Sequence, residues 1–216
     1  MAITSPDLLE HASAEEVLDY GVRRFHPRLA VACSFQKEES VLLHMLTEVC
    51  PDARVFTIDT GVLFEETLET WRRFEERFEI AIEAFDARSP GDPWTLGRCC
   101  GTAKVQALEA ALRDAHAWVT GIRREQAPTR AGTAKLERDR ARGIWKLNPI
   151  ADWSEQDVWG YVREHALPYN ALHDRGYGSI GCVPCTLPGR GRAGRWAGLE
   201  KTECGIHEIP VAPDVG

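Results

Sequence analysis

Short apolar runs recur along the chain and predict the strands of a sheet. Each run is the length of a buried strand, and polar or glycine-containing segments separate one run from the next. The runs are RLAVACSF (28–35), ARVFTID (53–59), IAIEAF (80–85) and AWVTGI (117–122), and the segment KLNPI (146–150) continues the series.

Amphipathic stretches lie between these runs and predict helices. Ser13 and Glu16 have the spacing of a capping box, and Ser154 with Asp157 repeats it. The stretch VLFEETLETWRRFEERF (62–78) carries its large apolar residues at a helical period. Two further helices are expected at about 38–49 and 104–114.

Strands that alternate with helices predict an α/β fold. Right-handed crossovers then give a mostly parallel, twisted sheet with helices on both faces, in a Rossmann-like arrangement. Ligands of such sheets bind beyond the carboxyl ends of the strands. This rule gathers the loops SFQKEES (34–40), DTG (59–61) and GIRREQAPTR (121–130) at one edge.

The C-terminal part of the chain has a different character. From Tyr169 onward glycine and proline are dense and the periodicity fades. We therefore expect one domain over residues 1–216, made of an α/β core (1–168) and an irregular tail (169–216). The tail needs something other than a hydrophobic core to order it.

Composition and charge narrow the class of protein. The chain has 216 residues, of which 44% are hydrophobic, and this is enough for a sizeable core. Its net charge of -7 argues against general nucleic-acid binding, which depends on neutralising phosphates. We find neither a basic stretch followed by an apolar run at the N-terminus nor an apolar window long enough for a membrane span. A cytoplasmic protein is expected, and a homo-oligomer is compatible with the sequence.

Seven cysteines in a chain without an export signal favour metal binding or thiol chemistry over disulfides. Four of them form two clusters, the adjacent pair Cys99 and Cys100 and the CVPC unit of Cys182 and Cys185. Such a set can hold Zn²⁺ or an iron-sulfur cluster and would tie the tail to the core. The adjacent pair is uncommon in structural zinc sites and favours iron and sulfur.

The other three cysteines have separate contexts. Cys33 and Cys50 lie in apolar surroundings and are expected to be core thiols. Cys204 lies in the terminal stretch KTECGIHE, downstream of several arginines, which is a setting for a nucleophile. Glu203 would oppose thiolate formation there. An incidental exposed cysteine is the alternative.

Three loops carry groups suited to an anion. SFQKEES offers helix-start N–H groups, two serine hydroxyls and Lys37, although it lacks the GxxxxGK of a Walker A loop. GIRREQAPTR and GRGRAGR add guanidinium groups. The alternatives are a polar turn, a solvated charged loop and a disordered glycine-rich segment. The arginines of the second and third loops are Arg123, Arg124, Arg130, Arg190, Arg192 and Arg195.

The set of motifs resembles the assimilatory adenylyl-sulfate (APS) reductases and their relatives, the phosphoadenylyl-sulfate (PAPS) reductases. The shared elements keep one order and cover most of the chain: SFQKEES, IDTG, the cysteine pair, GIRREQAPTR, NPIADW, GCVPCT, GRAGRW and KTECGIH. The resemblance implies an adenine nucleotide alpha hydrolase-like fold. It also implies a role in sulfate assimilation and cysteine biosynthesis. PAPS reductases often lack the four clustered cysteines, so their presence implies APS as substrate and one 4Fe-4S cluster.

The resemblance also implies roles for individual residues. Cys204 would be the nucleophile, while Lys104 would lie between the cluster and the phosphosulfate of the substrate. Arg192, Arg195 and His207 would surround the same anion. The cluster ligands would be Cys99, Cys100, Cys182 and Cys185. The nucleotide pocket would be lined by Ser34, Phe35, Gln36, Lys37, Asp59, Thr60, Gly61 and Arg123.

The implied reaction has two thiol steps. Cys204 attacks the sulfonyl sulfur of APS, AMP leaves, and thioredoxin or another external dithiol protein releases sulfite from the S-sulfocysteine. Two alternatives are PAPS reduction and a non-catalytic nucleotide-binding zinc protein. An ATP pyrophosphatase is disfavoured because SFQKEES lacks the glycines of SGGxDS.

Overall fold

A six-stranded sheet forms the centre of the computed structural model, which describes residues 6–88, 102–196 and 203. The strand order is β3-β2-β1-β4-β6-β5, and every neighbouring pair is parallel except β5 and β6. The α/β fold expected from the sequence is therefore confirmed, with one antiparallel edge strand. The strands are β1 (Leu29–Ala32), β2 (Arg54–Asp59), β3 (Ile82–Asp86), β4 (Ala117–Val119), β5 (Leu136–Asp139) and β6 (Ile144–Leu147).

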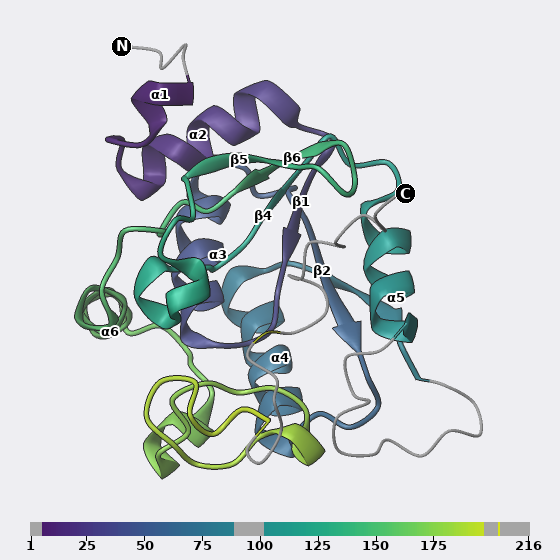
Figure 1. The fold of residues 1–216 in the computed structure, drawn as a ribbon, viewed down its shortest axis with the longest axis vertical. Helices are drawn as coiled ribbons and strands as arrows, with labels where there is room; N and C mark the ends of the chain where they lie inside the picture. The colour runs from purple at the N-terminus through teal and green to yellow at the C-terminus, as the bar shows by residue number, and fades with distance from the viewer. Residues whose placement is uncertain (1–5, 89–101, 197–202, 204–216) are drawn as a thin grey trace, which may run out of the picture.

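Helices cover both faces of this sheet (Figure 1). One face packs against α5, and the other packs against α2, α3 and α4, with α6 lying on α3. A short α1 precedes them. The helices are α1 (Pro6–Leu9), α2 (Ala14–Phe25), α3 (Lys37–Val49), α4 (Glu65–Phe78), α5 (Thr102–Leu112) and α6 (Glu155–Glu164).

The two hydrophobic clusters follow from strand periodicity, because successive side chains of a strand point to opposite faces. Ala30, Phe56 and Trp118 are buried on the α5 side. Their neighbours Val31 and Val55 are buried in the larger cluster on the opposite side. The central strands are therefore covered on both faces, as their continuous apolar sequences predict.

The capping boxes read from the sequence are present. The hydroxyl of Ser13 accepts from the N–H of Glu16, and that of Ser154 accepts from the N–H of Asp157. The apolar run 28–35 is a strand only over β1, and the stretch 62–78 is helical only from Glu65. The segment 146–150 contributes the end of β6, which begins at Ile144. The edge strand β5 was not predicted.

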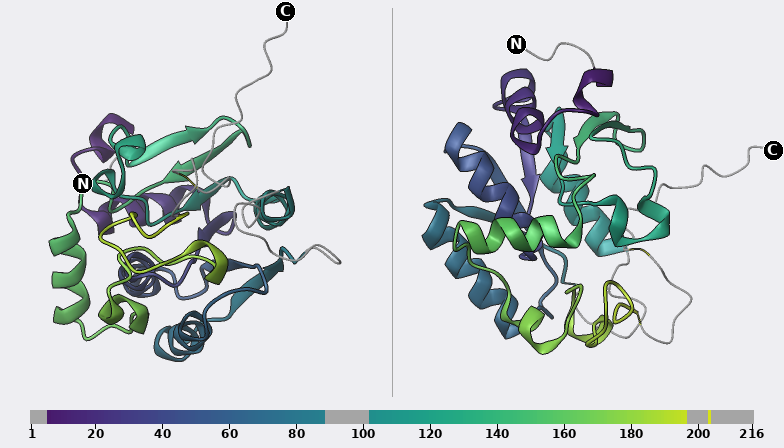
Figure 2. Two further views of the ribbon diagram at one scale, coloured as in Figure 1. Left: turned by 60° about the horizontal axis from the view of Figure 1, so that its bottom comes forward. Right: turned by 90° about the vertical axis from the view of Figure 1, so that its left-hand side faces the viewer.

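The described part of the tail is ordered by turns rather than by strands or long helices. It contains the short 3-10 helices η3 (Ala171–Arg175) and η4 (Val183–Cys185). The backbone N–H of Gly178 donates to the carbonyl of Gly189, whose own N–H donates to the carbonyl of Gly176. The backbone N–H of Trp196 donates to the carbonyl of Cys185. Figure 2 shows this segment, in yellow-green, lying across the edge at which the parallel strands end.

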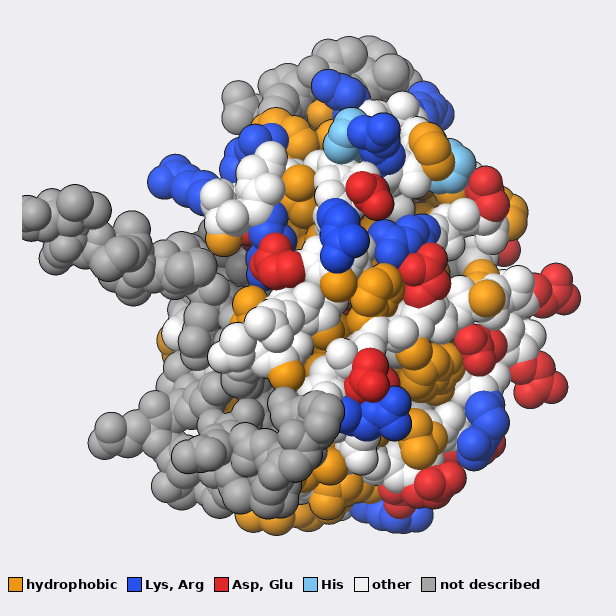
Figure 3. Space-filling model, turned by 90° about the vertical axis from the view of Figure 1, so that its right-hand side faces the viewer, with side chains coloured by type: hydrophobic (Ala, Val, Ile, Leu, Met, Phe, Trp, Pro, Cys, Tyr) orange, Lys and Arg blue, Asp and Glu red, His pale blue; other side chains and the backbone are white. Residues whose placement is uncertain are grey.

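Charge is mixed on the visible surface. On the face shown in Figure 3, Lys and Arg side chains lie among Asp and Glu side chains and form no continuous basic patch. Among the residues that the structure describes, no helix has the length and apolar character needed to cross a membrane.

Candidate active site

One cavity of about 630 Å³ lies at the carboxyl ends of β1, β2 and β4. The start of α3, the loop after β4 and the described tail all contribute to its wall, so segments far apart in the sequence meet there. Asp59, Gly61 and Cys185 are not among the lining residues. The lining includes these residues singled out from the sequence: Ser34, Phe35, Gln36, Lys37, Thr60, Lys104, Arg123, Cys182, Arg192 and Arg195.

Glu39, a residue of the SFQKEES loop itself, accepts the hydrogen bonds that begin α3. One carboxyl oxygen of Glu39 accepts hydrogen bonds from the Ser34 hydroxyl and from the backbone N–H of Gln36, each at 3.1 Å. The second serine of the loop, Ser40, turns away and donates to the carbonyl of Pro168 at 2.5 Å. A carboxyl group of the chain thus already occupies part of the helix start that the sequence predicted for an external anion.

Phe35 and Gln36 connect this loop to its surroundings. Phe35 has a backbone φ of 61° and borders the cavity, but its ring is buried and stacks on Trp71 with the ring centroids 5.1 Å apart. The side-chain oxygen of Gln36 accepts from the N–H of Ile180 at 2.8 Å. The loop is therefore joined to the core on one side and to the tail on the other.

A buried ion-pair cluster lies beside the loop. Lys37 Nζ lies 3.5 Å from a carboxylate oxygen of Glu38 and 3.3 Å from one of Glu155. Arg123 contacts the same two carboxylates at 2.9 Å and 2.6 Å. The side chains of Lys37, Glu38 and Arg123 are each at most 3% exposed. Lys37 and Arg123, the two cations predicted to line the nucleotide pocket, are therefore both paired with carboxylates.

The adjacent glutamates Glu38 and Glu39 have opposite pKa shifts. Burial, reinforced by the charge of Glu38, raises the pKa of Glu39 to about 8. Burial acts in the same direction on Glu38, but the charges of Lys37 and Arg123 outweigh it and lower the pKa of Glu38 to about 2. At neutral pH one carboxyl is ionised and its neighbour retains a proton.

Away from the ion-pair cluster of Lys37 and Arg123, the wall of the cavity carries further cations, and we call this part the basic end. Lys104, Arg130, Arg192 and Arg195 contribute to its wall. Lys104 comes from the first turn of α5, while Arg130 ends the 3-10 helix η2 (Pro128–Arg130). Cations from two core segments and from the tail thus converge, which is the arrangement needed to bind an anion in a partly desolvated site.

Glu203 joins the terminal segment to this basic end. Arg130 donates to both of its carboxylate oxygens, at 2.9 Å and 2.7 Å, and Arg192 donates at 3.0 Å. The hydroxyl of Thr129 adds a bond of 2.9 Å. Burial opposes ionisation of Glu203, but the bonds and charge of Arg130, with the charge of Arg192, lower its pKa.

This arrangement changes the expectation for Glu203. From the sequence its charge was expected to oppose thiolate formation at Cys204, whereas in the structure two guanidinium groups compensate that charge. The sequence contained the arginines and the glutamate but not their pairing, because Arg130 and Glu203 are far apart in the chain. Cys204 and His207 lie outside the described residues.

Cys33, just after β1, lines the cavity, and the described tail brings two further cysteines to this region, of which Cys182 lines the cavity and Cys185 does not. Both are buried, at the N-cap and the last residue of η4. The Cys182 sulfur lies 3.3 Å from the hydroxyl oxygen of Thr60. The guanidinium of Arg195 packs on Gly181, where a Cβ would lie 2.5 Å from a guanidinium nitrogen. A side chain at this position would displace the guanidinium, so glycine allows the tail to bring a cation against the backbone beside Cys182.

The remaining cysteines divide as follows. Cys33 and Cys50 are each 4% exposed and belong to the larger hydrophobic cluster, as predicted. Cys99 and Cys100 lie outside the described residues. The sulfur atoms of Cys182 and Cys185 are soft donors three positions apart in buried surroundings, which suits one half of a four-cysteine metal or cluster site.

Comparison with known proteins gives a consistent result. The family model described as the phosphoadenosine phosphosulfate reductase domain matches residues 28–188. An adenosine 5'-phosphosulfate reductase of Salinibacter ruber is 39% identical over 214 residues, covering 92% of this chain and 85% of that protein. A protein of the same description from Bacillus mycoides is 40% identical, covering 92% of each chain.

Solved structures agree with the sequence comparison. A phosphoadenylyl-sulfate reductase from Candida auris superposes with a TM-score of 0.74 and 27% identity, covering 87% of this chain and 100% of that one. An FMN adenylyltransferase from Candida glabrata, at 17% identity and a TM-score of 0.67, shares the fold alone. Since the family model spans most of the chain and the relatives match it over nearly its full length, the chain belongs to the phosphoadenosine phosphosulfate reductase domain family.

Proposed function

We propose that this protein reduces adenylyl sulfate to sulfite and AMP, with Cys204 as nucleophile and an external dithiol protein of the thioredoxin type as electron donor. The observation that supports it most is the attachment of Glu203 to Arg130 and Arg192 in the cavity wall. Consecutive Cα atoms are about 3.8 Å apart, so a nucleophile at the position after Glu203 would act close to these arginines.

The first step forms a thiosulfate bond. The Cys204 thiolate attacks the sulfur of the phosphosulfate, and the bond from that sulfur to the bridging oxygen breaks, so that AMP leaves with the electron pair. Charge develops on the phosphate as this bond breaks. Lys104, Arg192 and Arg195 lie in the wall from which they would stabilise that charge.

The second step requires two electrons from outside the chain. A thiolate of the donor attacks the sulfur of Cys204, and sulfite leaves with the electrons of the broken S–S bond. The second thiol of the donor then displaces Cys204 from the mixed disulfide and returns it as a thiolate. The product of donor oxidation is an intramolecular disulfide.

A 4Fe-4S cluster fits the described part of its donor set. Cys182 and Cys185 are buried cysteines on a single short turn, and Cys99 with Cys100 would complete the four ligands. When bound, the cluster supplies a compact metal centre that organises the site and adds positive character near the substrate. Arg195, which packs on Gly181, would hold its charge beside this centre.

The distribution of charge favours APS over PAPS. PAPS carries an additional 3'-phosphate, which needs a cation of its own. At the end of the cavity near α3, Lys37 and Arg123 are both paired with Glu38 and Glu155. A second phosphate at that end would have to displace carboxylates, whereas a neutral ribose and adenine would not. At the basic end Arg130 and Arg192 share one carboxylate, that of Glu203, and Lys104 and Arg195 add their positive charges to the wall, so the single phosphosulfate of APS would bind there.

Labelling with a radioactive substrate tests the mechanism. Anaerobically purified protein is incubated with ³⁵S-labelled APS without reductant, separated by denaturing electrophoresis, and then treated with thioredoxin. We expect label on the wild type that thioredoxin releases as sulfite, no label on Cys204→Ser, and label on the control Cys50→Ser. Label retained on Cys204→Ser would refute the assignment of the nucleophile.

Substrate preference has its own test, the comparison of APS and PAPS turnover in the wild type and in Glu38→Gln. Removing the Glu38 charge leaves Lys37 and Arg123 less compensated, so the ratio of kcat/KM for PAPS to that for APS is expected to rise at least several-fold. Glu48→Gln, an exposed change on the same helix, is the control. A wild type that prefers PAPS would overturn the proposed specificity.

A further inference from the structure

Three potential metal ligands meet at the edge of the sheet opposite the cavity. They are the imidazole of His26, the thiol of Cys50 and the carboxylate of Asp52, and their ligand atoms all lie within 4.8 Å of one another. Among the residues that the structure describes, this is the group of three such side chains that could hold a metal ion. The reaction proposed above uses none of them.

The local backbone holds these side chains in place. Cys50 and Asp52 belong to the turn Cys50-Pro51-Asp52-Ala53, which is closed by a bond of 3.1 Å from the N–H of Ala53 to the carbonyl of Cys50. Proline in the second position of such a turn restricts the backbone. His26 comes from the end of α2, which packs against α3. Two of the three ligands are therefore fixed relative to each other before a metal binds.

The distances match a tetrahedral zinc site. The Cys50 sulfur lies 3.4 Å from Asp52 Oδ1, and His26 Nε2 lies 3.4 Å from Asp52 Oδ2. Bonds of about 2.0–2.3 Å at a tetrahedral angle separate neighbouring zinc ligands by roughly 3.4–3.6 Å. Because the two distances are to different oxygens of Asp52, a zinc ion held by one of them requires a rotation of this carboxylate, which its exposure permits.

The electrostatic surroundings also favour a cation. His26 is the C-cap of α2 and Cys50 is the C-cap of α3, so two helix carboxyl ends meet at this point. Helix carboxyl ends carry partial negative charge. The Asp52 side chain is 77% exposed, which provides access from solvent and room for water as a fourth ligand.

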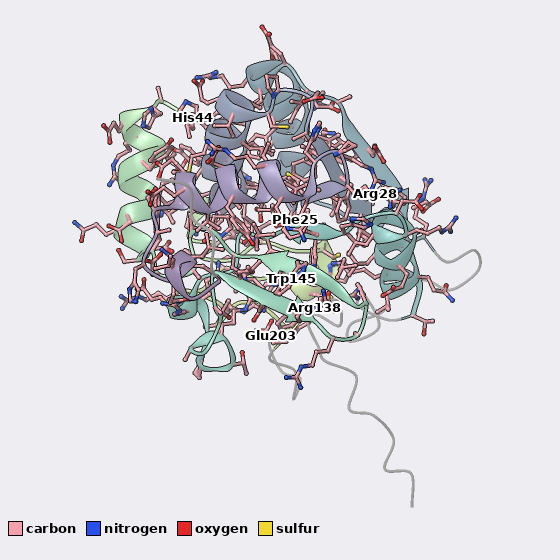
Figure 4. The ribbon with its side chains drawn as sticks, turned by 90° about the horizontal axis from the view of Figure 1, so that it is seen from above. Phe25, Arg28, His44, Arg138, Trp145 and Glu203 are labelled. Atoms are coloured by element: carbon pink, nitrogen blue, oxygen red, sulfur yellow. The ribbon has the colours of Figure 1, made fainter. Side chains whose placement is uncertain are left out.

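We propose that His26, Cys50 and Asp52 bind one Zn²⁺ ion, with the Cys50 thiol giving up its proton to solvent on binding. Nitrogen, thiolate and carboxylate donors in tetrahedral geometry suit zinc. The two negative ligands neutralise the ion. The site joins the ends of α2 and α3 just before β1 and β2 begin, and therefore acts on stability rather than on the reaction. Figure 4 shows the molecule from above and labels Phe25 and Arg28, which flank the residues His26 and Pro27 in the chain.

Equilibrium dialysis against Zn²⁺ at a buffered free concentration, followed by metal analysis, tests the site. The protein is purified anaerobically so that any cluster stays in place. We expect the wild type to retain one zinc per chain more than Asp52→Asn and more than Cys50→Ser. Cys33→Ala is the matched control, because Cys33 is equally buried but belongs to no group of three potential ligands among the described residues. It is expected to bind zinc as the wild type does.

Thermal unfolding provides a second readout, since a metal that binds the folded state raises the unfolding midpoint. Zinc is expected to raise the midpoint of the wild type and of Cys33→Ala, but not that of Asp52→Asn. Equal zinc content in the wild type and in Asp52→Asn would overturn the proposal. An equal loss of bound zinc in Asp52→Asn and in Cys33→Ala would also overturn the proposal, because zinc binding would then not depend on His26, Cys50 and Asp52. None of these measurements depends on the substrate.

Discussion

Glu39 is a buried acid whose proton couples folding to pH. Burial, with the charge of Glu38, raises its pKa to about 8 from the ordinary value of 4.5. Between these values the folded protein holds a proton that the unfolded chain releases. The stabilising contribution is therefore complete below pH 4.5 and is lost as the pH rises through 8.

Glu39→Gln removes this proton and should remove the pH dependence that it causes. One proton corresponds to a slope of at most about 1.4 kcal/mol per pH unit. Urea denaturation between pH 5 and pH 8 is expected to show that the wild type loses stability with rising pH relative to the variant. The exposed Glu48→Gln should run parallel to the wild type. A Glu39→Gln curve that also runs parallel would contradict the assignment.

Glu203 is the residue by which the terminal segment is attached to the cavity wall. Hydrogen bonds to charged groups contribute about 1.5–3 kcal/mol each, so Glu203→Gln should lower kcat/KM for APS by about 10- to 100-fold. The same change should speed alkylation of Cys204 by iodoacetamide, measured by peptide mapping. A loss of fold alone would not produce this combination in a protein of unchanged thermal stability.

A conservative substitution of Arg130 shows whether its positive charge alone or its paired hydrogen bonds to Glu203 are needed for activity. Arg130→Lys keeps the charge but loses the two-pronged bond to Glu203, and its activity is expected to lie between those of the wild type and Glu203→Gln. Glu164→Gln, an exposed change in α6, should leave both readouts unaltered. Wild-type activity in Glu203→Gln would show that the attachment has no role in turnover.

At the scale of elements, two capping boxes offer a matched comparison. Ser13 caps α2, far from the cavity, whereas Ser154 caps α6, which begins with Glu155. Replacing either serine with alanine should cost about 1 kcal/mol of stability. Ser154→Ala should also raise the KM for APS several-fold, because the position of Glu155 determines its ion pairs with Lys37 and Arg123. Urea denaturation and steady-state kinetics measure the two effects, and a raised KM in Ser13→Ala would contradict this account.

The elements that the sequence predicted are those specified by local signals. Capping boxes and apolar runs depend on residues a few positions apart, so they could be read from the chain. The strand β5 has the polar sequence LERD and forms because it pairs with β6, where the guanidinium of Arg138 lies 4.9 Å from the ring of Trp145 (Figure 4). No local sequence pattern predicts such a strand.

The candidate site shows the same division. The residues that line the cavity were identified as motifs, but their partners were not. Lys37 and Arg123 were expected to face an anion, and their pairing with Glu38 and Glu155 depends on segments that only the fold brings together. The same holds for Arg130 and Glu203. Charge pairing between distant segments is a property of the tertiary structure and leaves no periodic trace in the sequence.

At the scale of the whole molecule, the cavity exists because an irregular tail completes a wall that the α/β core leaves open. The tail folds back on itself so closely that Gly178 lies against the backbone of Gly191. A Cβ on Gly178 would lie 2.5 Å from the nitrogen and 2.6 Å from the oxygen of Gly191. Backbone atoms cannot rotate out of the way as side chains can, so the loop would have to open.

Gly178→Ala should therefore weaken substrate binding without changing the fold of the α/β core. Opening the loop moves Arg192 and weakens its bond to Glu203, so the KM for APS should rise by about tenfold or more, in line with the loss of a charged hydrogen bond. Circular dichroism should stay unchanged, because the strands and long helices lie outside the loop. Gly160→Ala in α6, where a Cβ would meet nothing within 4 Å, should stabilise the helix and leave kinetics alone. Equal kinetics for the two variants would mean that the tail contributes no wall to the substrate site.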